Sequence, residues 1–332
     1  MPNPLALSDA ADLIDVSIQQ IWLKGSEAES RQFEQFYNVE TGVSDYYLKD
    51  SSLTGLGYAG RIVENAAVTA QSPAQGYDKT YTQVRFGVLL SFTWHVWKFG
   101  IKKRILENIT AEARKAVSDK REQLCADRLD QSYNTSYSVA DISGNYSVTT
   151  TGGDGLALVS NAHTREDGGA NWNNRITDGT TLNMDFDYDA LKAAHRTAAL
   201  IVNPQGKPMN VNLDTLIVSR GYAVDNRATE ILGAINRGYI PGSADRDTSA
   251  SPAFKIIRTP WIQTNTSYWW MFDSSLKNNR YGLQYKESQG VDLVGPNVVF
   301  KTDEIQYKAH AAFDIGFNDP RNLVGSKNTN AA

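Results

Sequence analysis

The strictest pattern in this 332-residue chain is an alternation of apolar and other side chains between residues 81 and 97. The segment reads YTQVRFGVLLSFTWHVW, and every second residue from Val84 to Val96 is apolar. A period of two predicts a β-strand with one buried face. At about 3.3 Å per residue such a strand would reach roughly 43 Å, well beyond the usual length. The chain must therefore provide an unusually long surface for this strand to cover.

A hairpin arm is the fold that we expect around this strand. A weaker extended run, GRIVENAAVT (60–69), precedes it, and the joining segment AQSPAQGYDKT (70–80) is rich in turn formers such as Pro73 and Gly76. Since a two-stranded ribbon is marginal alone in water, either this chain or another copy must cover it. Two alternatives are open, an arm that projects from the body and a strand pair inside a larger sheet. The polar tip favours the projecting arm.

A long helix follows, predicted from about Lys102 to Tyr133 because apolar residues recur there at three- and four-residue steps without Gly or Pro. Its other face is interpreted as solvated and carries charges of alternating sign: Glu112, Arg114, Lys115, Asp119, Lys120, Arg121 and Glu122. Cys125 lies mid-helix and is interpreted as a small core residue. As the only cysteine, it excludes an internal disulfide and a cysteine-based zinc site.

The remaining elements indicate an α+β fold without internal repeats. Two short helices are expected at the N-terminus, over 8–24 and from a capping box at Ser26. Residues 134–183 are poorly periodic and rich in Gly, Ser, Thr and Asn. They are followed by a helix over 187–202, a buried strand over 213–219 and another helix up to about 235. Strand-like segments then lead to DEIQYKAHAAFDIGF, where alternate residues from Ile305 to Phe317 predict a strand that returns to pair with an earlier one.

Composition excludes several classes of protein. The net charge is −4 and no basic stripe with interleaved aromatics is present, which argues against a sequence-specific nucleic-acid reader. No apolar stretch is long enough to span a membrane, and acidic residues stand where a signal peptide would be apolar. The chain is thus expected in a reducing, cytosolic compartment when it is made. Its 16 Tyr and 7 Trp against 11 Phe favour half-buried surfaces and interfaces.

The segment SNAHTREDGGANWNNR (160–175) is the best candidate for chemistry. His163, Glu166 and Asp167 would suit a metal site or a general base with its orienting acid, as in a metal-dependent hydrolase. No other histidine is placed to complete a metal site, and no catalytic or phosphate-binding motif occurs elsewhere. A structured surface loop is therefore the preferred interpretation, with no catalytic residue, no metal and no cofactor.

The order of these parts resembles that of HK97-fold major capsid proteins of tailed bacteriophages. Their loop after the long helix is similar to LVSNAHTREDGGANWNNRI (158–176), and their strand-then-helix to LDTLIVSRGYAVDNRATEIL (213–232). SYWWMFDSS (267–275) and YGLQYKESQGVDL (281–293) resemble later strands of that family, and AAFDIGFNDPRNLVGS (311–326) its C-terminal ending.

This resemblance implies an α+β HK97-like capsid fold with four parts. These are an N-terminal arm (1–46), an extended β-hairpin loop (47–98), a peripheral domain with the long spine helix (99–184 and 290–332), and an axial domain (185–289). Hexamers and pentamers of the chain would form an icosahedral shell around phage double-stranded DNA. Tyr77, Lys79, Arg85 and Trp94 are the expected interface residues.

The same resemblance implies a virion protein that is assembled in the host cytoplasm. Its partners would be other copies of itself, a separate scaffolding protein, a portal, a cement protein and, without sequence preference, the packaged DNA. No membrane is involved. Family members sometimes form Lys–Asn cross-links, but Lys79 is expected only to protect a strand edge. The alternatives are an encapsulin-like nanocompartment shell and the hydrolase considered above.

Overall fold

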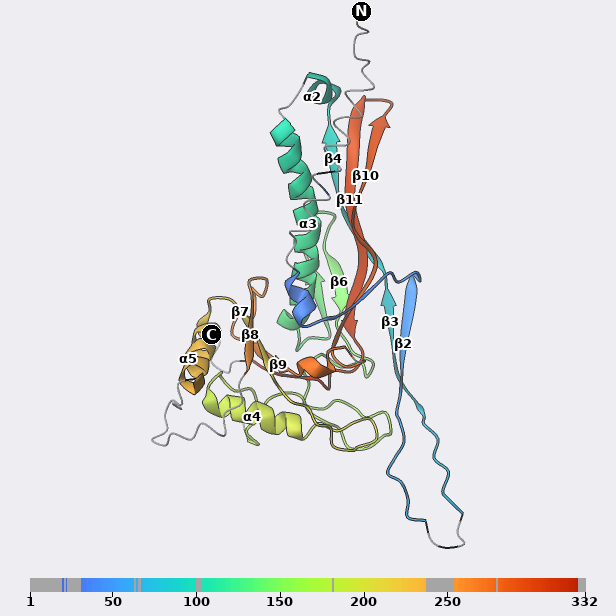
Figure 1. Cartoon of the computed structure of the whole chain (residues 1–332), viewed down its shortest axis with the longest axis vertical. Coiled ribbons are helices and arrows are strands. Elements are labelled where there is room, and N and C mark those ends of the chain that lie inside the picture. The colour runs from blue at the N-terminus through green and yellow to red at the C-terminus, as the bar shows by residue number, and fades with distance from the viewer. Residues whose placement is uncertain are drawn as a thin grey trace, which may run out of the picture.

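The computed structural model describes residues 31–62, 67–99, 103–180, 182–236, 254–278 and 280–327, with residues 20, 22 and 64. Figure 1 shows an elongated body built on one long helix and a long sheet, a smaller unit at one end, and a two-stranded arm that projects beyond it. In these ranges no helix is both long and apolar enough to cross a membrane.

The body is organised by a four-stranded sheet in the order β1–β10–β11–β4. Strand β11 (Glu304–Phe317) is antiparallel to both of its neighbours, β10 (Leu283–Val299) and β4 (Val84–Phe92). Strand β1 (Asn38–Thr41) runs parallel to the start of β10. The predicted returning strand is confirmed, because Ile305 of β11 pairs with Phe92 and Phe313 with Val84.

Helix α3 (Lys103–Asp130) lies along this sheet and matches the predicted spine helix closely. Its apolar residues Ala113, Val117 and Leu124 share one core with alternate residues of β11. The short 3-10 helix η1 (Gln32–Gln35) adds Phe33 to that core, and α2 (Trp94–Phe99) joins β4 to α3. Cys125 is fully buried in the core, as predicted.

The charged face of α3 is only partly solvated: Glu112 and Lys115 are exposed as predicted, but neighbouring segments cover Arg114, Arg121 and Glu122. Arg121 is only 1% exposed and forms an ion pair with Glu287 of β10, with 3.3 Å between Nη1 and Oε2. The Tyr285 hydroxyl donates to the same carboxylate at 2.9 Å. Arg114 is buried too, with its guanidinium over the Trp22 ring. Helical spacing alone could not predict partners that lie so far away in the sequence.

The arm is a hairpin of β2 (Tyr47–Leu53) and β3 (Gln75–Thr82), so the predicted strand pairing was wrong. The alternating segment 81–97 divides between two sheets at Gln83, whose N–H donates to the Tyr46 carbonyl, and becomes helical at Trp94. The described part of 60–69 contains no strand. A period of two reports one buried face, but it does not report which sheet buries it.

The smaller unit holds a second sheet in the order β12–β9–β7–β8. Its strands are β12 (Leu323–Ser326), β9 (Trp269–Phe272), β7 (Thr215–Ser219) and β8 (Lys255–Thr259). Helices α4 (Tyr188–Ala199) and α5 (Ala223–Asn236) pack on it, as the sequence predicted for 187–202 and 219–235. The two cores meet at β9, because Trp269 is buried in the smaller core and its neighbour Trp270 in that of the body.

Three short elements complete the described chain. Strands β5 (Ser136–Val139) and β6 (Tyr146–Thr149) form a hairpin beside α3, and η2 (Ser274–Leu276) follows β9. The predicted helix over 8–24 and the cap at Ser26 lie outside the described residues, except for Gln20 and Trp22.

Removing one partner of the buried ion pair is expected to destabilise the subunit strongly. Arg121→Ala leaves the Glu287 carboxylate buried without its cation, and should lower the free energy of unfolding by about 3–5 kcal/mol. Urea denaturation followed by circular dichroism measures the loss. Lys115→Ala, at an exposed position of the same helix, serves as the control. Equal stability of the two variants would contradict a structural role for the pair.

Candidate assembly surfaces

The base of the arm is fastened to the loop of residues 160–175. Oε1 of Glu166 accepts hydrogen bonds from the Ser52 hydroxyl at 2.6 Å and from the Tyr77 N–H at 3.2 Å. The Tyr77 hydroxyl also lies 2.7 Å from Oγ1 of Thr164. One carboxylate thus holds both strands of the hairpin, which fixes the direction in which the arm leaves the body.

Two glycines allow this close approach. A Cβ atom added to Gly76 would lie 2.2 Å from the Ser52 hydroxyl and 2.5 Å from Oε1 of Glu166. One added to Gly153 would lie 2.2 Å from Oδ1 of Asn318 and 2.7 Å from Cβ of Tyr77. A side chain at Gly76 would displace Ser52 and Glu166, and one at Gly153 would press on Tyr77 and Asn318, so glycine at both positions lets the hairpin pack closely on the body.

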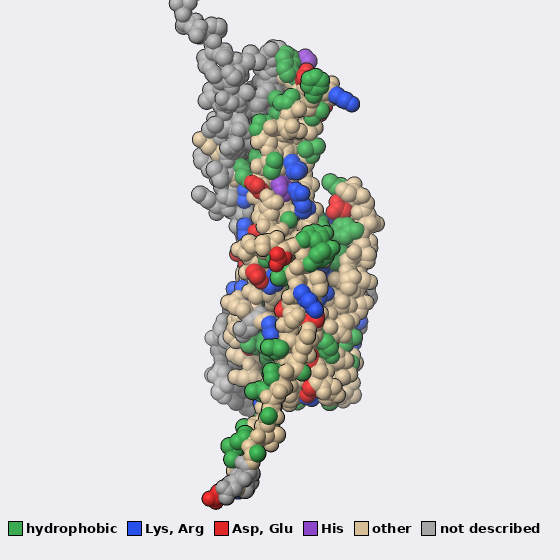
Figure 2. All heavy atoms as spheres, turned by 90° about the vertical axis from the view of Figure 1, so that its right-hand side faces the viewer, with side chains coloured by type: hydrophobic (Ala, Val, Ile, Leu, Met, Phe, Trp, Pro, Cys, Tyr) green, Lys and Arg blue, Asp and Glu red, His purple; other side chains and the backbone are tan. Residues whose placement is uncertain are grey.

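Beyond its paired strands, the arm exposes large apolar side chains. Thr54 and Ala74 close the paired part, since the Thr54 N–H donates to the Ala74 carbonyl at 2.9 Å. Figure 2 shows apolar side chains along the length of the projecting arm. Tyr46, Tyr47 and Leu53 are more than half exposed, but they belong to the paired base of the arm. The large apolar side chains beyond Thr54 that are more than half exposed are Leu56, Tyr58, Ile62 and Val68. Such a set on a segment without a core of its own is typical of an interaction surface.

A second exposed apolar surface lies on the body sheet, on the side away from α3. Val294, Lys308 and Leu89 stand side by side on β10, β11 and β4, and Val294 and Leu89 are 49% and 58% exposed. They line a shallow groove of about 470 Å³ that Tyr307 and Pro296 also border. Val298 and Phe300 are also exposed at the end of β10, but Val298 pairs with Ile305 and so lies on the other face of the sheet.

The four predicted interface residues do not form one surface. Tyr77 faces the loop of its own chain through Thr164, and the Lys79 ammonium donates to the Thr151 carbonyl at 2.6 Å. Lys79 is therefore in the paired base of the hairpin and not at its tip, contrary to the expectation from the misplaced turn. Arg85 and Trp94 are exposed, on β4 and α2. Whether any of the four contacts another subunit stays a prediction.

Sequence reasoning missed the apolar residues of the tip itself. Leu56, Tyr58, Ile62 and Val68 stand in a Gly- and Ala-rich stretch without periodicity. That combination was the available signal, because large apolar residues that follow no secondary-structure period have no core to enter.

His163 lies in a buried hydrogen-bond network, and not with Glu166 and Asp167. Its Nδ1 is 2.6 Å from Oδ2 of Asp154, and its Nε2 is 3.2 Å from Oδ1 of Asn174. The imidazole is fully buried and stacks on Trp172, with 4.5 Å between ring centroids. Asp167 binds Arg165, and Glu166 binds the arm. Over the residues that the structure describes, no group of three or more metal-binding side chains occurs.

The loop of 160–175 is thus structured and its middle is at the surface, as predicted, but His163, Trp172 and Asn174 within it are buried. The His163 N–H donates to the Trp172 carbonyl and the Trp172 N–H donates back, which folds the loop onto itself. Asn174 then connects the loop to its start through a bond from its amide to the Leu158 carbonyl. These polar side chains satisfy backbone groups and one another, so the loop forms a rigid platform for the arm.

Loss of the Glu166 carboxylate is expected to loosen the arm at its base. Glu166→Ala removes the hydrogen bonds to Ser52 and Tyr77, and bonds to a charged group contribute about 1.5–3 kcal/mol. Hydrogen exchange of the amides in 47–53 and 75–82 should become roughly ten- to a hundredfold faster. Asp167→Ala in the same loop is the matched control. Unchanged exchange in Glu166→Ala would show that the arm is held by other contacts.

Glu122 anchors the segment that precedes β1. Its two carboxylate oxygens accept from the N–H groups of Gln32 and Phe33, at 2.7 and 3.3 Å. Burial is the largest influence on this group and raises the pKa of Glu122 to about 7, against the opposing effect of these hydrogen bonds. The folded protein therefore holds a proton on Glu122 that the unfolded chain releases at lower pH.

Stability is expected to fall as pH rises through this range. Because the pKa of Glu122 is about 7 when folded and near 4.5 when unfolded, its protonation stabilises the fold at low pH, and the contribution is lost between these values. The melting temperature of the wild type should drop more between pH 5 and pH 8 than that of Glu122→Gln. Other acids contribute equally to both proteins and cancel. Parallel pH profiles would contradict the shifted pKa.

A comparison with protein families identifies the chain. The family model described as "Phage capsid protein" matches residues 76–326, which is most of the sequence. The chain belongs to this family. It is a structural capsid protein, which self-associates into a capsid and is part of the phage virion.

One solved structure agrees with this capsid protein in fold. The capsid of the cyanophage P-SCSP1u is 11% identical, covers 90% of this chain and 88% of its own, and has a TM-score of 0.54. The chain is also similar to a structure from Mycobacterium phage Adephagia, with 11% identity, 92% coverage of both chains and a TM-score of 0.49. The Pyrococcus furiosus virus-like particle is 13% identical, covers 93% of this chain and 96% of its own, and has a TM-score of 0.46. No curated protein matches the sequence. The predicted α+β HK97-like capsid fold and the role as a major capsid protein are confirmed.

Proposed function

We propose that hexamers and pentamers of this capsid protein form an icosahedral shell around phage double-stranded DNA, and that the arm of each copy lies on a neighbouring one. The carrying observation is the arm itself, which is fixed at its base by Glu166 and exposes large apolar side chains beyond Thr54. A segment held in one direction has little entropy left to lose when it binds.

The groove beside Val294 and Leu89 is the surface that we assign to the arm of the neighbour. It is open, it offers the apolar side chains of Val294, Leu89 and Pro296, and Leu89 and Val294 lie on the opposite side of the sheet from α3. Full burial of one large apolar side chain contributes about 1.5–3 kcal/mol. A few such side chains from the arm would outweigh the association cost of several kcal/mol. A closed shell repeats this contact at every subunit.

The domain boundaries that we propose follow the sheets and differ from those expected from the sequence. The arm loop ends at residue 83, because β4 belongs to the body sheet. The peripheral domain then comprises 84–184 and 283–322. The axial domain comprises 185–282 with β12, which pairs with β9.

We further propose that the protein has no enzymatic activity. The hydrolase alternative needs His163 as an accessible base, but this imidazole is buried and both of its ring nitrogens are engaged. An encapsulin-like nanocompartment is no better supported than a phage shell. The nucleic acid content of purified particles distinguishes a genome container from a protein container.

Assembly in the host cytoplasm with a separate scaffolding protein, a portal and a cement protein remains part of this proposal. Contact with packaged DNA is expected to be weak and sensitive to salt, because a net charge of −4 provides no general attraction to phosphate.

Replacing residues 55–73 by a short Gly–Ser turn tests the role of the arm. The base of the hairpin keeps its pairing, so the subunit should fold with an unchanged circular dichroism spectrum and yet fail to form particles. Light scattering and negative-stain microscopy compare it with the wild type under the same conditions. The double variant Tyr58→Ser, Ile62→Ser keeps the length of the arm and should impair assembly in the same direction. Intact shells from the shortened chain would refute the proposed contact.

A further inference from the structure

A cavity of about 310 Å³ lies where the arm meets the body, and the assembly contacts proposed above do not use it. It opens between β3, the start of β4, the C-terminal part of α3, the β5–β6 hairpin and β11. Its volume is about twice that of the ~150 Å³ engineered cavity that holds benzene. The space therefore fits a ring or a short branched chain together with one polar group.

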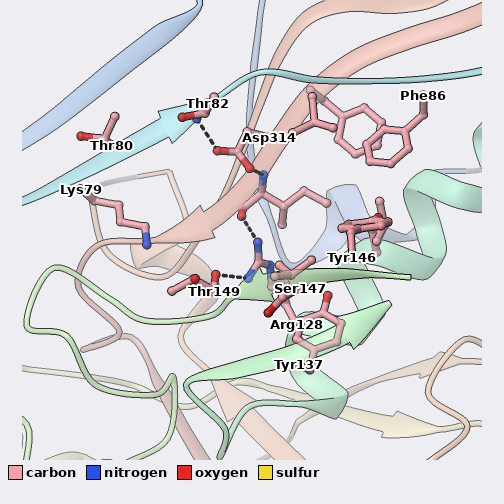
Figure 3. A pocket seen from close by; sticks show the side chains of 15 residues that line it. Lys79, Thr80, Thr82, Phe86, Arg128, Tyr137, Tyr146, Ser147, Thr149 and Asp314 are labelled. Atoms are coloured by element: carbon pink, nitrogen blue, oxygen red, sulfur yellow. Dashed lines mark hydrogen bonds between the residues drawn. The ribbon is translucent and has the colours of Figure 1, made fainter. Parts of the chain in front are cut away.

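The lining of the cavity divides into a polar and an apolar part. Figure 3 shows Lys79, Arg128 and Asp314 toward the polar side, Phe86 at the opposite end, and Tyr137 and Tyr146 between Arg128 and that end. Val84, Leu124 and Phe313 add to the apolar part. Ligand sites are typically apolar with a few polar groups placed to orient what binds, and this lining has that character.

The cations of the polar part are held by neutral groups. Arg128 is 8% exposed, and its guanidinium donates to the carbonyls of Thr149 and Ile315 at 2.8 and 2.7 Å. The Lys79 ammonium donates to the carbonyl of Thr151. Over the described residues, neither cation has a carboxylate within 4.0 Å. Burial, and then the positive charge of Arg128, lower the pKa of Lys79.

One carboxylate belongs to the cavity, and its hydrogen bonds go to the backbone. Asp314 accepts from the N–H groups of Thr82 and Ile315, at 2.7 and 2.8 Å. Two cations and one carboxylate leave the polar part with a single positive charge. A ligand with one negative charge would balance it, whereas a doubly charged phosphate would not.

Two tyrosine hydroxyls supply further donors. The Oη atoms of Tyr137 and Tyr146 are shielded from solvent, and neither has a hydrogen-bond partner among the described residues. Both side chains line the cavity beside Arg128. A buried hydroxyl without a partner costs about 1–3 kcal/mol, so an acceptor placed here would be favoured.

We propose that this cavity binds a small organic monocarboxylate with an apolar body, such as an arylacetic or branched-chain acid. Its carboxylate would lie between Lys79 and the tyrosine hydroxyls, and its apolar part against Phe86 and Leu124. Because the cavity joins β3 to the body, a bound acid would also hold the arm to the body.

Phenylacetate is the probe, and phenylacetamide is its neutral control of the same shape. Calorimetry and thermal shift on the purified full-length protein should detect binding of the acid and at least tenfold weaker binding of the amide. Lys79→Met should weaken binding of the acid about tenfold, while Lys79→Arg retains it. Lys49→Met, which changes an exposed lysine of the same hairpin, should leave it unchanged. Equal binding of acid and amide, or full affinity in Lys79→Met, would overturn the proposal.

A second variant serves if Lys79→Met does not fold. Tyr146→Phe keeps the shape of the cavity and removes one donor, and should weaken phenylacetate binding about fivefold. Assembled particles provide the last measurement. Retained binding there supports a ligand site, whereas loss of binding on assembly would show that a neighbouring copy fills the cavity.

Discussion

The body of this capsid protein depends on the double pairing of β11. In the part of the chain that the structure describes, β11 lies between β4 and β10 and joins them into one sheet, and its alternate apolar residues face α3. Phe92 and Ile305 are paired although more than half of the chain separates them in the sequence. Such non-local contacts cost chain entropy, and the contacts of the core offset this cost only when the whole core forms together. We therefore expect the spine helix, the sheet and the loop of 160–175 to fold and unfold cooperatively.

The arm is held firmly to the body at its base, and its described outer part is not paired in a sheet. Hydrogen bonds that Ser52 and Tyr77 donate to Glu166 fix the base of the arm, whereas the described part of residues 55–73 contains no strand. Contacts from Lys207 to the Gly57 carbonyl and from Arg280 to the Leu53 carbonyl guide it on one side. An apolar surface that would be a liability in a monomer is thus presented in a defined direction, as subunits that repeat by symmetry require.

Much of the fold could be predicted from local periodicity, and most of the candidate surface could not. The spine helix, the strand of 213–219 and the returning strand were correct because each buries one face with a regular period. The change of sheet at Gln83 leaves that period intact, so the hairpin was given the wrong partner and Lys79 the wrong place. The ion pair of Arg121 with Glu287 and the network of His163 join residues that only the folded chain brings together. The class of capsid protein came from the order of the parts, and no single residue carried it.

The fit of Gly76 and Gly153 around Tyr77 has an evolutionary consequence. Gly76 lies in β3 and Gly153 in the turn that follows β6, and these two segments do not pair with each other. Each glycine is needed because the other side of its contact is already full. Neither can acquire a side chain by a single mutation unless the opposing segment moves first. Descendants of this sequence should therefore vary freely in the unpaired part of the arm, while the base of the arm and the loop change together or not at all.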